Sequence, residues 1–167
     1  MRLFIAIKFT EDIRLFLDKL AKELKAHSAS GTFTLKENYH LTLAFIGETD
    51  RCRDLKRILN TISFDRFDIR FSGSGNFGDI QWVGLERSDP LDRLAGIIKQ
   101  KLISEGFDID RKPFRPHITL ARKCVPDKGF RLSVPETDMT CTAVSLMDSS
   151  RINGRLTYTE IFKKELS

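Results

Sequence analysis

Two six-residue segments of this chain carry nearly the same sequence. Residues 40–45 read HLTLAF and residues 117–122 read HITLAR, so four positions are identical and a fifth is aliphatic in both. The chain has only three histidines, and two of them, His40 and His117, begin these segments. Because imidazole titrates near neutral pH, a repeated pair of this kind predicts a general acid and a general base.

Strand alternation predicts which groups each segment presents. On a strand, His40, Thr42 and Ala44 share one face, while the bulky Leu41 and Leu43 share the other. The second copy places its equivalent residues in the same way: His117, Thr119 and Ala121 on one face, Ile118 and Leu120 on the other. If the two polar faces meet across a cleft, two imidazoles and two hydroxyls surround one small volume. That set suits a phosphate, since hydroxyls donate to its oxygens while the imidazoles move protons.

The last residue of each copy is harder to place. Alternation turns Phe45 toward the core and turns Arg122 away from His117. A bulge or twist at the strand end would bring Arg122 back to the cleft, where it would add positive charge. A solvated charge at the end of a strand explains Arg122 equally well.

The similarity extends well beyond six residues. Shifting the chain by the 77 positions between the histidines aligns a strand at 2–9 with one at 79–86, each followed by a helix and then the histidine strand. The apolar spacing predicts helices over 13–24 and 91–102, the first capped by Thr10. For the second we expect an Asp89 cap, Pro90 in the first helical position and a stop at Gly106. Further expectations are a helix over 51–62, a loop over 128–139, and strands over 67–71, 140–148 and 155–163.

This pattern indicates an ancient duplication and an α+β fold. We expect residues 1–167 to form a single bilobal domain with pseudo-two-fold symmetry. Two antiparallel sheets would flank a central cleft, with the helices outside. No apolar run is long enough for a transmembrane helix, and the N-terminus does not read as a signal peptide. The net charge of +5 is compatible with a polyanionic partner but does not establish one.

Other chemistries have little support in the sequence. Cys52, Cys124 and Cys141 have no CxxC spacing, which indicates reduced thiols in the cytoplasm. Two histidines without neighbouring acidic or cysteine ligands make a poor metal set, so we expect no metal. Residues 72–75, SGSG, lack the lysine and helix of a phosphate-binding loop and read as a turn or strand end. His27 has no counterpart and reads as a surface or C-cap residue.

With these motifs in place, the chain resembles the 2H phosphoesterase superfamily, which is named for paired His-x-Thr/Ser (HxTx) motifs. It is most similar to the RNA 2′,3′-cyclic phosphodiesterases, also called 2′-5′ RNA ligases, of bacteria and archaea. The segments that carry the resemblance are RLFIAI at 2–7, HLTLAFIGE at 40–48, WVGL at 82–85, KPFRPHITLAR at 112–122 and the strand around Tyr158. Tyr39 stands where we associate leucine with the family.

The resemblance implies a phosphoric diester hydrolase that needs no metal or other cofactor and opens an RNA-terminal 2′,3′-cyclic phosphate to a 2′-phosphate. It implies that His40 is the proton donor and His117 the proton acceptor. Thr42 and Thr119 would hold phosphate oxygens, and Arg122 would add positive charge.

The same resemblance leaves the roles of two aromatic residues open. Phe45 or Phe114 could stack on the terminal base, although core packing explains both equally well and alternation favours it for Phe45. The partners would be RNA ends bearing a cyclic phosphate or small cyclic nucleotides, with no membrane, and we expect a monomer. The reverse reaction would join RNA ends without ATP. The alternative function is a non-catalytic module on the same fold that binds RNA ends or nucleotides.

Overall fold

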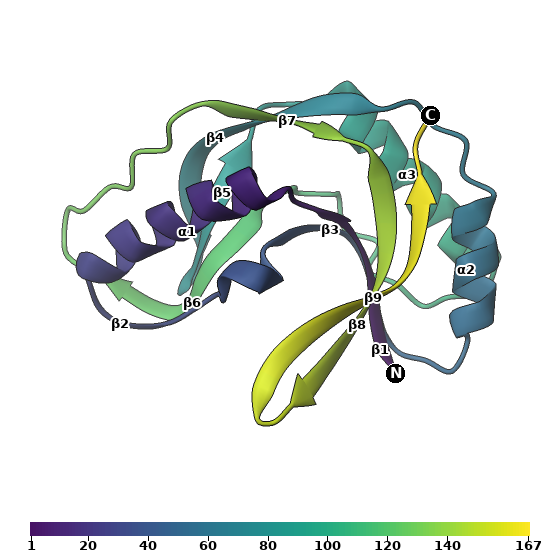
Figure 1. Cartoon of the computed structure of the whole chain (residues 1–167), viewed down its shortest axis with the longest axis horizontal. Coiled ribbons are helices and arrows are strands. Elements are labelled where there is room, and N and C mark those ends of the chain that lie inside the picture. The colour runs from purple at the N-terminus through teal and green to yellow at the C-terminus, as the bar shows by residue number, and fades with distance from the viewer.

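Nine strands in two antiparallel sheets form the framework of the molecule, and three α-helices cover it (Figure 1). The computed structural model describes residues 1–167. The four-stranded sheet has the order β3 (His40–Glu48), β1 (Arg2–Lys8), β8 (Ala143–Ile152) and β9 (Arg155–Glu165). The five-stranded sheet has the order β2 (Ser28–Phe33), β6 (Ile118–Pro126), β5 (Ile80–Leu85), β4 (Phe67–Phe77) and β7 (Thr137–Cys141). The α+β class with two antiparallel sheets is therefore confirmed.

Each of the two sheets contains strands from both halves of the chain. In the first half β1 pairs with β3, and 77 residues later β5 pairs with β6 in the same way. A later strand of each half joins the sheet of the other half. Strand β4, from the first half, pairs with β5, and β8, from the second half, pairs with β1. Each sheet is completed by a strand from the other half, so neither half can form its sheet alone.

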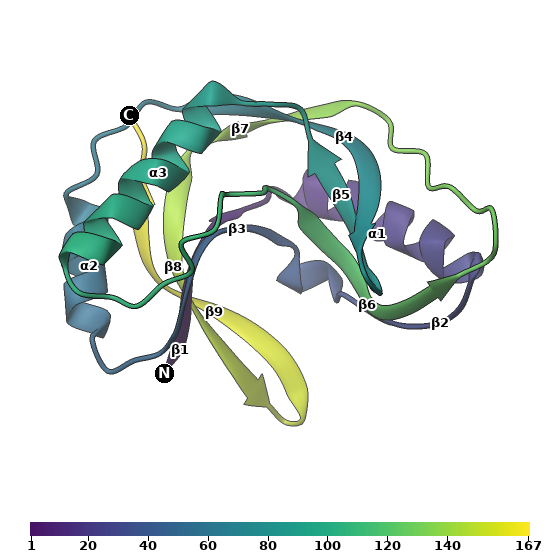
Figure 2. The same ribbon diagram turned by 180° about the vertical axis from the view of Figure 1, so that it is seen from behind.

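The helices cross over too. Helix α1 (Glu11–Ala26) follows β1 but packs against β2 and β6, whereas α3 (Asp89–Ser104) follows β5 but packs against β3. In Figures 1 and 2, α1 accordingly lies beside the five-stranded sheet, and α3 lies with α2 (Cys52–Asn60) on the other side of the molecule. None of the three helices is long and apolar enough to cross a bilayer.

The predicted helices are present, with one cap corrected. Thr10 is the N-cap residue of α1, and His27 is the C-cap residue of the same helix, as expected. The cap of α3 is Ser88 rather than Asp89, because the Ser88 hydroxyl accepts a hydrogen bond from the amide of Leu91 at 3.2 Å. Gly106, with a φ of +84°, follows the helix end as expected.

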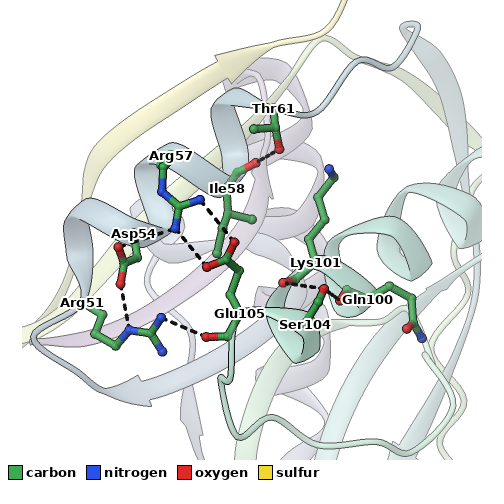
Figure 3. A network of polar contacts seen from close by, with 9 residues as sticks. All are labelled: Arg51, Asp54, Arg57, Ile58, Thr61, Gln100, Lys101, Ser104 and Glu105. Atoms are coloured by element: carbon green, nitrogen blue, oxygen red, sulfur yellow. Dashed lines mark hydrogen bonds and ion pairs between the residues drawn. The ribbon is translucent and has the colours of Figure 1, made fainter.

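An ion-pair network fixes α2 against the end of α3 (Figure 3). The guanidinium of Arg57 donates to both carboxylate oxygens of Glu105, at 3.2 and 3.0 Å. Arg51 donates to Asp54 and to the main-chain carbonyl of Glu105, each at 2.9 Å. These arginines lower the pKa of the Asp54 and Glu105 carboxyls. The groups are largely solvated, so the network orients the helices more than it stabilises the fold.

One strand prediction was wrong in extent, and one strand was missed. The single strand expected over 140–148 is divided at Thr142, because β7 pairs with β4 in one sheet and β8 pairs with β1 in the other. Strand β2 was not predicted at all, since its sequence SASGTF is largely exposed and lacks apolar alternation. A short 3₁₀ helix, η1 (Lys36–Asn38), connects β2 to β3.

One hydrophobic core joins both sheets and all three helices. The bulky residues of the two histidine strands belong to it, as predicted: Leu41, Leu43, Ile118 and Leu120 are all buried. A second, smaller cluster of Phe4, Ala6 and Met147, with Tyr158 packed on it, lies apart from this core. The two histidine strands are thus anchored in a common interior.

Candidate active site

The two histidine strands contain the same irregularity at the same place. In the β1–β3 ladder, Ala6 lies opposite Thr42 and Ile5 opposite Ala44, which leaves Leu43 without a partner. In the β5–β6 ladder, Trp82 lies opposite Thr119 and Gln81 opposite Ala121, which leaves Leu120 without a partner. Leu43 and Leu120 are 77 residues apart, so the bulge is repeated together with the motif.

This bulge corrects the expected facing of the strand ends. A one-residue insertion reverses the alternation beyond it. Ala44 and Ala121 pack against the core rather than beside the histidines. Phe45 and Arg122, by contrast, come to the same cavity as the histidines. The prediction that alternation buries Phe45 was wrong, and its side chain is 49% exposed.

Both imidazoles are held by the main chain in the same way. Nδ1 of His40 lies 2.7 Å from the carbonyl oxygen of Asn38, and Nδ1 of His117 lies 2.7 Å from that of Arg115. A carbonyl only accepts, so Nδ1 carries the proton in each ring. The Nε2 atoms are therefore the ones that gain or lose a proton during chemistry.

The two Nε2 atoms have different partners. Nε2 of His40 lies 2.9 Å from the hydroxyl of Thr42. No such bond links His117 to Thr119, whose carbonyl instead accepts a hydrogen bond from the Thr34 hydroxyl at 3.0 Å. In this arrangement Thr42 already bonds a histidine, whereas the Thr119 hydroxyl has no side-chain partner.

Different aromatic groups surround the two rings. His40 lies between Phe4 and Tyr158, with ring centroids 4.9 and 5.0 Å away. The His117 ring meets Phe77 edge-on at 5.0 Å and lies 6.3 Å from Trp82.

The SGSG segment, expected to be a turn or strand end, is part of β4. A Cβ atom at Gly75 of this segment would collide with the Trp82 indole. Gly75 therefore allows Trp82 to lie across the strand beside His117.

Burial lowers the pKa of His40, and the positive charges of Arg122 and His117 lower it further, against the opposing effect of the Asn38 carbonyl. Burial also raises the pKa of the Tyr158 phenol, an effect that the charges of Arg122 and Arg2 oppose. Arg122 thus acts electrostatically on His40 although it is attached to the strand of His117. In the free protein these effects favour neutral His40.

One cavity of about 880 Å³ collects these groups. Its lining includes both histidines, Thr42, Thr119 and Arg122, together with Phe45. Four arginines line it and no aspartate, glutamate or lysine does. They are Arg2, Arg122, Arg151 and Arg155. Such a lining attracts an anionic ligand.

Phe114 does not belong to this cavity. Its side chain packs against the main hydrophobic core, and it is absent from the lining. Of the two interpretations left open for this residue, the structure favours core packing. Phe45 lines the cavity instead, with the guanidinium of Arg2 at 4.8 Å from its ring centroid, so its stacking on a base stays a prediction.

Several lining residues escaped the sequence reasoning. Arg2 and Phe4 stand on β1, Asn38 on η1, and Arg151 and Arg155 on the hairpin of β8 and β9. One signal was available for the hairpin, because Asn-Gly between two strands is typical of a tight turn. Asn153 and Gly154 both have positive φ, at 53° and 76°, as a type I′ turn requires. Arg2 and Asn38 carried no such signal.

Comparison with known proteins identifies the family and agrees with the fold. The family profile described as the 2′-5′ RNA ligase superfamily matches residues 9–152. An RNA 2′,3′-cyclic phosphodiesterase of Bacillus subtilis is 33% identical over 144 residues, 78% of each chain. One from Escherichia coli is 30% identical over 173 residues, which cover 96% of this chain and 93% of the relative.

Solved structures extend the likeness to the whole chain. The crystal structure of E. coli LigT complexed with 3′-AMP matches with a TM-score of 0.85 at 26% identity, covering 99% of this chain and 98% of that one. The chain belongs to the 2′-5′ RNA ligase superfamily. The resemblance to the RNA 2′,3′-cyclic phosphodiesterases is confirmed, and with it the expectation of a phosphoric diester hydrolase at the level of the family.

Proposed function

We propose that this protein hydrolyses the 2′,3′-cyclic phosphate at the end of an RNA chain and leaves a 2′-phosphate. The observation that carries the proposal is the shared cavity. Two imidazoles with Nδ1 tied to main-chain carbonyls line it together with two threonines and Arg122. An acid, a base and hydrogen-bond donors around one anion site are what a phosphodiester displacement requires. The relatives named above support RNA cyclic phosphate as the substrate.

In the proposed step, His117 Nε2 takes a proton from water while the water oxygen bonds to phosphorus. The bond between phosphorus and the 3′-oxygen breaks, and His40 Nε2 gives its proton to that oxygen. Thr42, Thr119 and Arg122 stabilise the charge on the non-bridging oxygens. The products are a 2′-phosphate and a free 3′-hydroxyl, and proton exchange with solvent restores both histidines.

The lowered pKa of His40 bears directly on this division of roles. In the free cavity the neutral form is favoured, which is the wrong form for a proton donor. A bound phosphodiester brings a negative charge, and a negative charge close to an imidazole favours its protonated form. We therefore propose that His40 becomes the acid when substrate binds.

The same geometry supports RNA ligation. An RNA 5′-hydroxyl, activated as the water is, would attack the cyclic phosphate, break the bond to the 3′-oxygen and create a 2′-5′ bond, with no requirement for ATP. No metal or cofactor enters hydrolysis or ligation in this proposal, since the cavity offers two histidines but no cysteine or carboxylate ligand. We also propose that residues 1–167 act as a single bilobal domain, because the strands that follow the two histidines belong to different sheets, and each sheet contains strands from both halves of the chain.

The test is hydrolysis of a 2′,3′-cyclic-phosphate oligonucleotide, with the product analysed by ³¹P NMR and with EDTA in a parallel sample. We expect a 2′-phosphate at the same rate in both samples. A 3′-phosphate would contradict the leaving group assigned to His40. Loss of activity with EDTA and recovery with zinc would contradict the metal-free step. Binding without turnover from pH 5 to 9 would favour a non-catalytic binding module.

A further inference from the structure

The hairpin formed by the ends of β8 and β9 is a separate wall of the cavity. Strand β8 pairs with β1 only as far as Asp148, so residues 149–158 form a two-stranded ribbon without a third strand. In Figures 1 and 2 this ribbon projects away from both sheets. Its tip nevertheless lines the cavity through Arg151, Asn153, Arg155 and Leu156.

A buried side-chain amide on η1, next to the histidine strand β3, holds the ribbon through a hydrogen bond. The side chain of Asn38, only 6% exposed, donates to the carbonyl of Leu156 at 3.0 Å. The main-chain carbonyl of the same Asn38 accepts the Nδ1 proton of His40. An isolated two-stranded ribbon is marginally stable in water, so this contact contributes to holding its tip over the cavity. The position of the ribbon and the orientation of His40 therefore depend on one residue.

The arginines of the cavity fall into two pairs. Arg122 ends the motif that His117 begins, and Arg2 lies over the ring of Phe45 at the end of the other motif, so we assign this pair to the reacting phosphate. Arg151 and Arg155 stand at the ribbon tip, on either side of the Asn-Gly turn. A cyclic phosphodiester carries one negative charge, and the first pair already suffices for it. The second pair has no carboxylate in the lining to neutralise it.

The tip arginines are available for a ligand. Arg151 has no ion-pair partner, and one of its nitrogens donates only to the carbonyl of Gly154 at 3.3 Å. Arg155 lies 3.8 Å from Glu37, and both side chains are mostly exposed, at 65% and 57%. Exposed pairs of this length contribute little, so a phosphate can replace Glu37. Arginine is also the residue best suited to hold a phosphate through two parallel hydrogen bonds.

We infer that Arg151 and Arg155 form a second phosphate site, which holds the phosphate on the 5′ side of the nucleoside that bears the cyclic phosphate. This inference rests on the proposed function and gives it a substrate preference. A chain with at least two phosphates engages both arginine pairs, whereas a nucleoside 2′,3′-cyclic phosphate engages only the pair beside the histidines. The ribbon thereby selects RNA ends over free cyclic nucleotides.

The test compares three substrates: a nucleoside 2′,3′-cyclic phosphate, the same compound with a 5′-phosphate, and a trinucleotide ending in the cyclic phosphate. We expect a 5′-phosphate alone to raise kcat/KM about tenfold at low salt, as two exposed charge pairs allow. Arg151→Gln with Arg155→Gln should remove that gain and leave the unphosphorylated substrate within about twofold. The same double variant should flatten the salt dependence of kcat/KM for the trinucleotide by about 0.7 in slope per lost contact.

The matched control is Arg53→Gln with Arg87→Gln, which removes two exposed charges outside the cavity. It should retain the gain from the 5′-phosphate. The inference is overturned if the wild type shows no gain, if the ribbon variant slows all three substrates equally, or if the control behaves like the ribbon variant.

If the wild type cleaves none of the three, the proposed function fails. The second phosphate site is then judged by calorimetric binding of a nucleoside 3′-phosphate with and without a 5′-phosphate. The ribbon variant should still lose the difference between these two ligands, and an equal affinity in wild type and variant would overturn the site.

Discussion

The two histidine strands share a device and differ in their surroundings. In both, Nδ1 is fixed by the carbonyl two residues earlier, and a bulge three residues after the histidine turns the last side chain of the motif toward the cavity. The neighbours differ, since Phe4 and Tyr158 enclose His40, and Phe77 and Trp82 flank His117. The repeated residues thus hold the two imidazoles in the same way, and the unrepeated residues give each imidazole a different environment.

The difference extends to charge. Arg122 takes the place in the second strand that Phe45 takes in the first, and it lowers the pKa of His40 across the cavity. One strand therefore supplies an aromatic face and the other a cation, both directed at the same volume. A single phosphodiester with an attached base has an anionic part and a flat apolar part, so this inequality suits such a ligand.

Removal of either imidazole is the largest change that the comparison predicts. His40→Ala and His117→Ala should each lower kcat about 10²- to 10⁴-fold, because each supplies one proton transfer. The double variant should be little worse than either single one, since the two act in one step. Circular dichroism would verify folding. A single variant that retains near wild-type turnover would show that its strand is not catalytic.

Arg122 offers a smaller and more informative change. Arg122→Gln should lower kcat/KM about 10- to 100-fold through loss of charged hydrogen bonds to the phosphate. It should also raise the pKa of His40, which an NMR titration of the imidazole would detect. The matched variant is Phe45→Leu, which leaves the charge of the cavity unchanged and should not alter that pKa. Equal titration curves for His40 with and without Arg122 would contradict the coupling between the strands.

Gly75→Ala should affect one strand and spare the other. A methyl group there collides with the Trp82 indole, which lies beside His117 in the five-stranded sheet, whereas β3 belongs to the other sheet. We expect a loss of about 1–3 kcal/mol in the free energy of unfolding, measured with urea. The NMR signals of His117 should shift while those of His40 stay in place. Gly96→Ala is the control, because a methyl group at that helical position meets nothing.

The smallest effect concerns pH and stability. A histidine whose pKa is lowered by folding binds fewer protons than in the unfolded chain, so stability falls as pH drops through the ordinary value of 6.5. The loss levels off below the lowered pKa of His40. His40→Gln should remove this component and flatten the curve of unfolding free energy between pH 7 and 5. A steeper curve in the variant would mean that the pKa is raised instead.

The sequence predicted the parts of this site that follow from local pattern. The duplicated motif, its anchoring leucines and the helix positions depend on periodicity and capping, which are legible in a short window. The facing of Phe45, Ala44 and Ala121 was wrong because a bulge is an extra residue relative to a partner strand, and that partner is distant in the chain. Arg122 lies in the cavity because of a bulge, which was one of the two interpretations that the sequence allowed for it.

The remaining gaps have the same origin. Arg2, Asn38 and Tyr158 acquire their roles only when β1, η1 and β9 meet, and nothing near them in the chain signals that meeting. The strand expected over 140–148 was divided because its two ends pair in different sheets. Pairing between distant strands decides such cases, and a single sequence carries little information about it.

The central claim is that the two copies of the motif have opposite roles, with His40 as acid and His117 as base. The most direct measurement replaces the 3′-oxygen by p-nitrophenolate, a leaving group that needs no proton, in an acyclic nucleoside 2′-phosphodiester. On this substrate His40→Ala should recover to within about tenfold of wild type, since only the general acid, a 10²- to 10⁴-fold contribution, becomes dispensable. His117→Ala should stay inactive. Recovery of His117→Ala in place of His40→Ala would contradict the assignment and reverse the two roles.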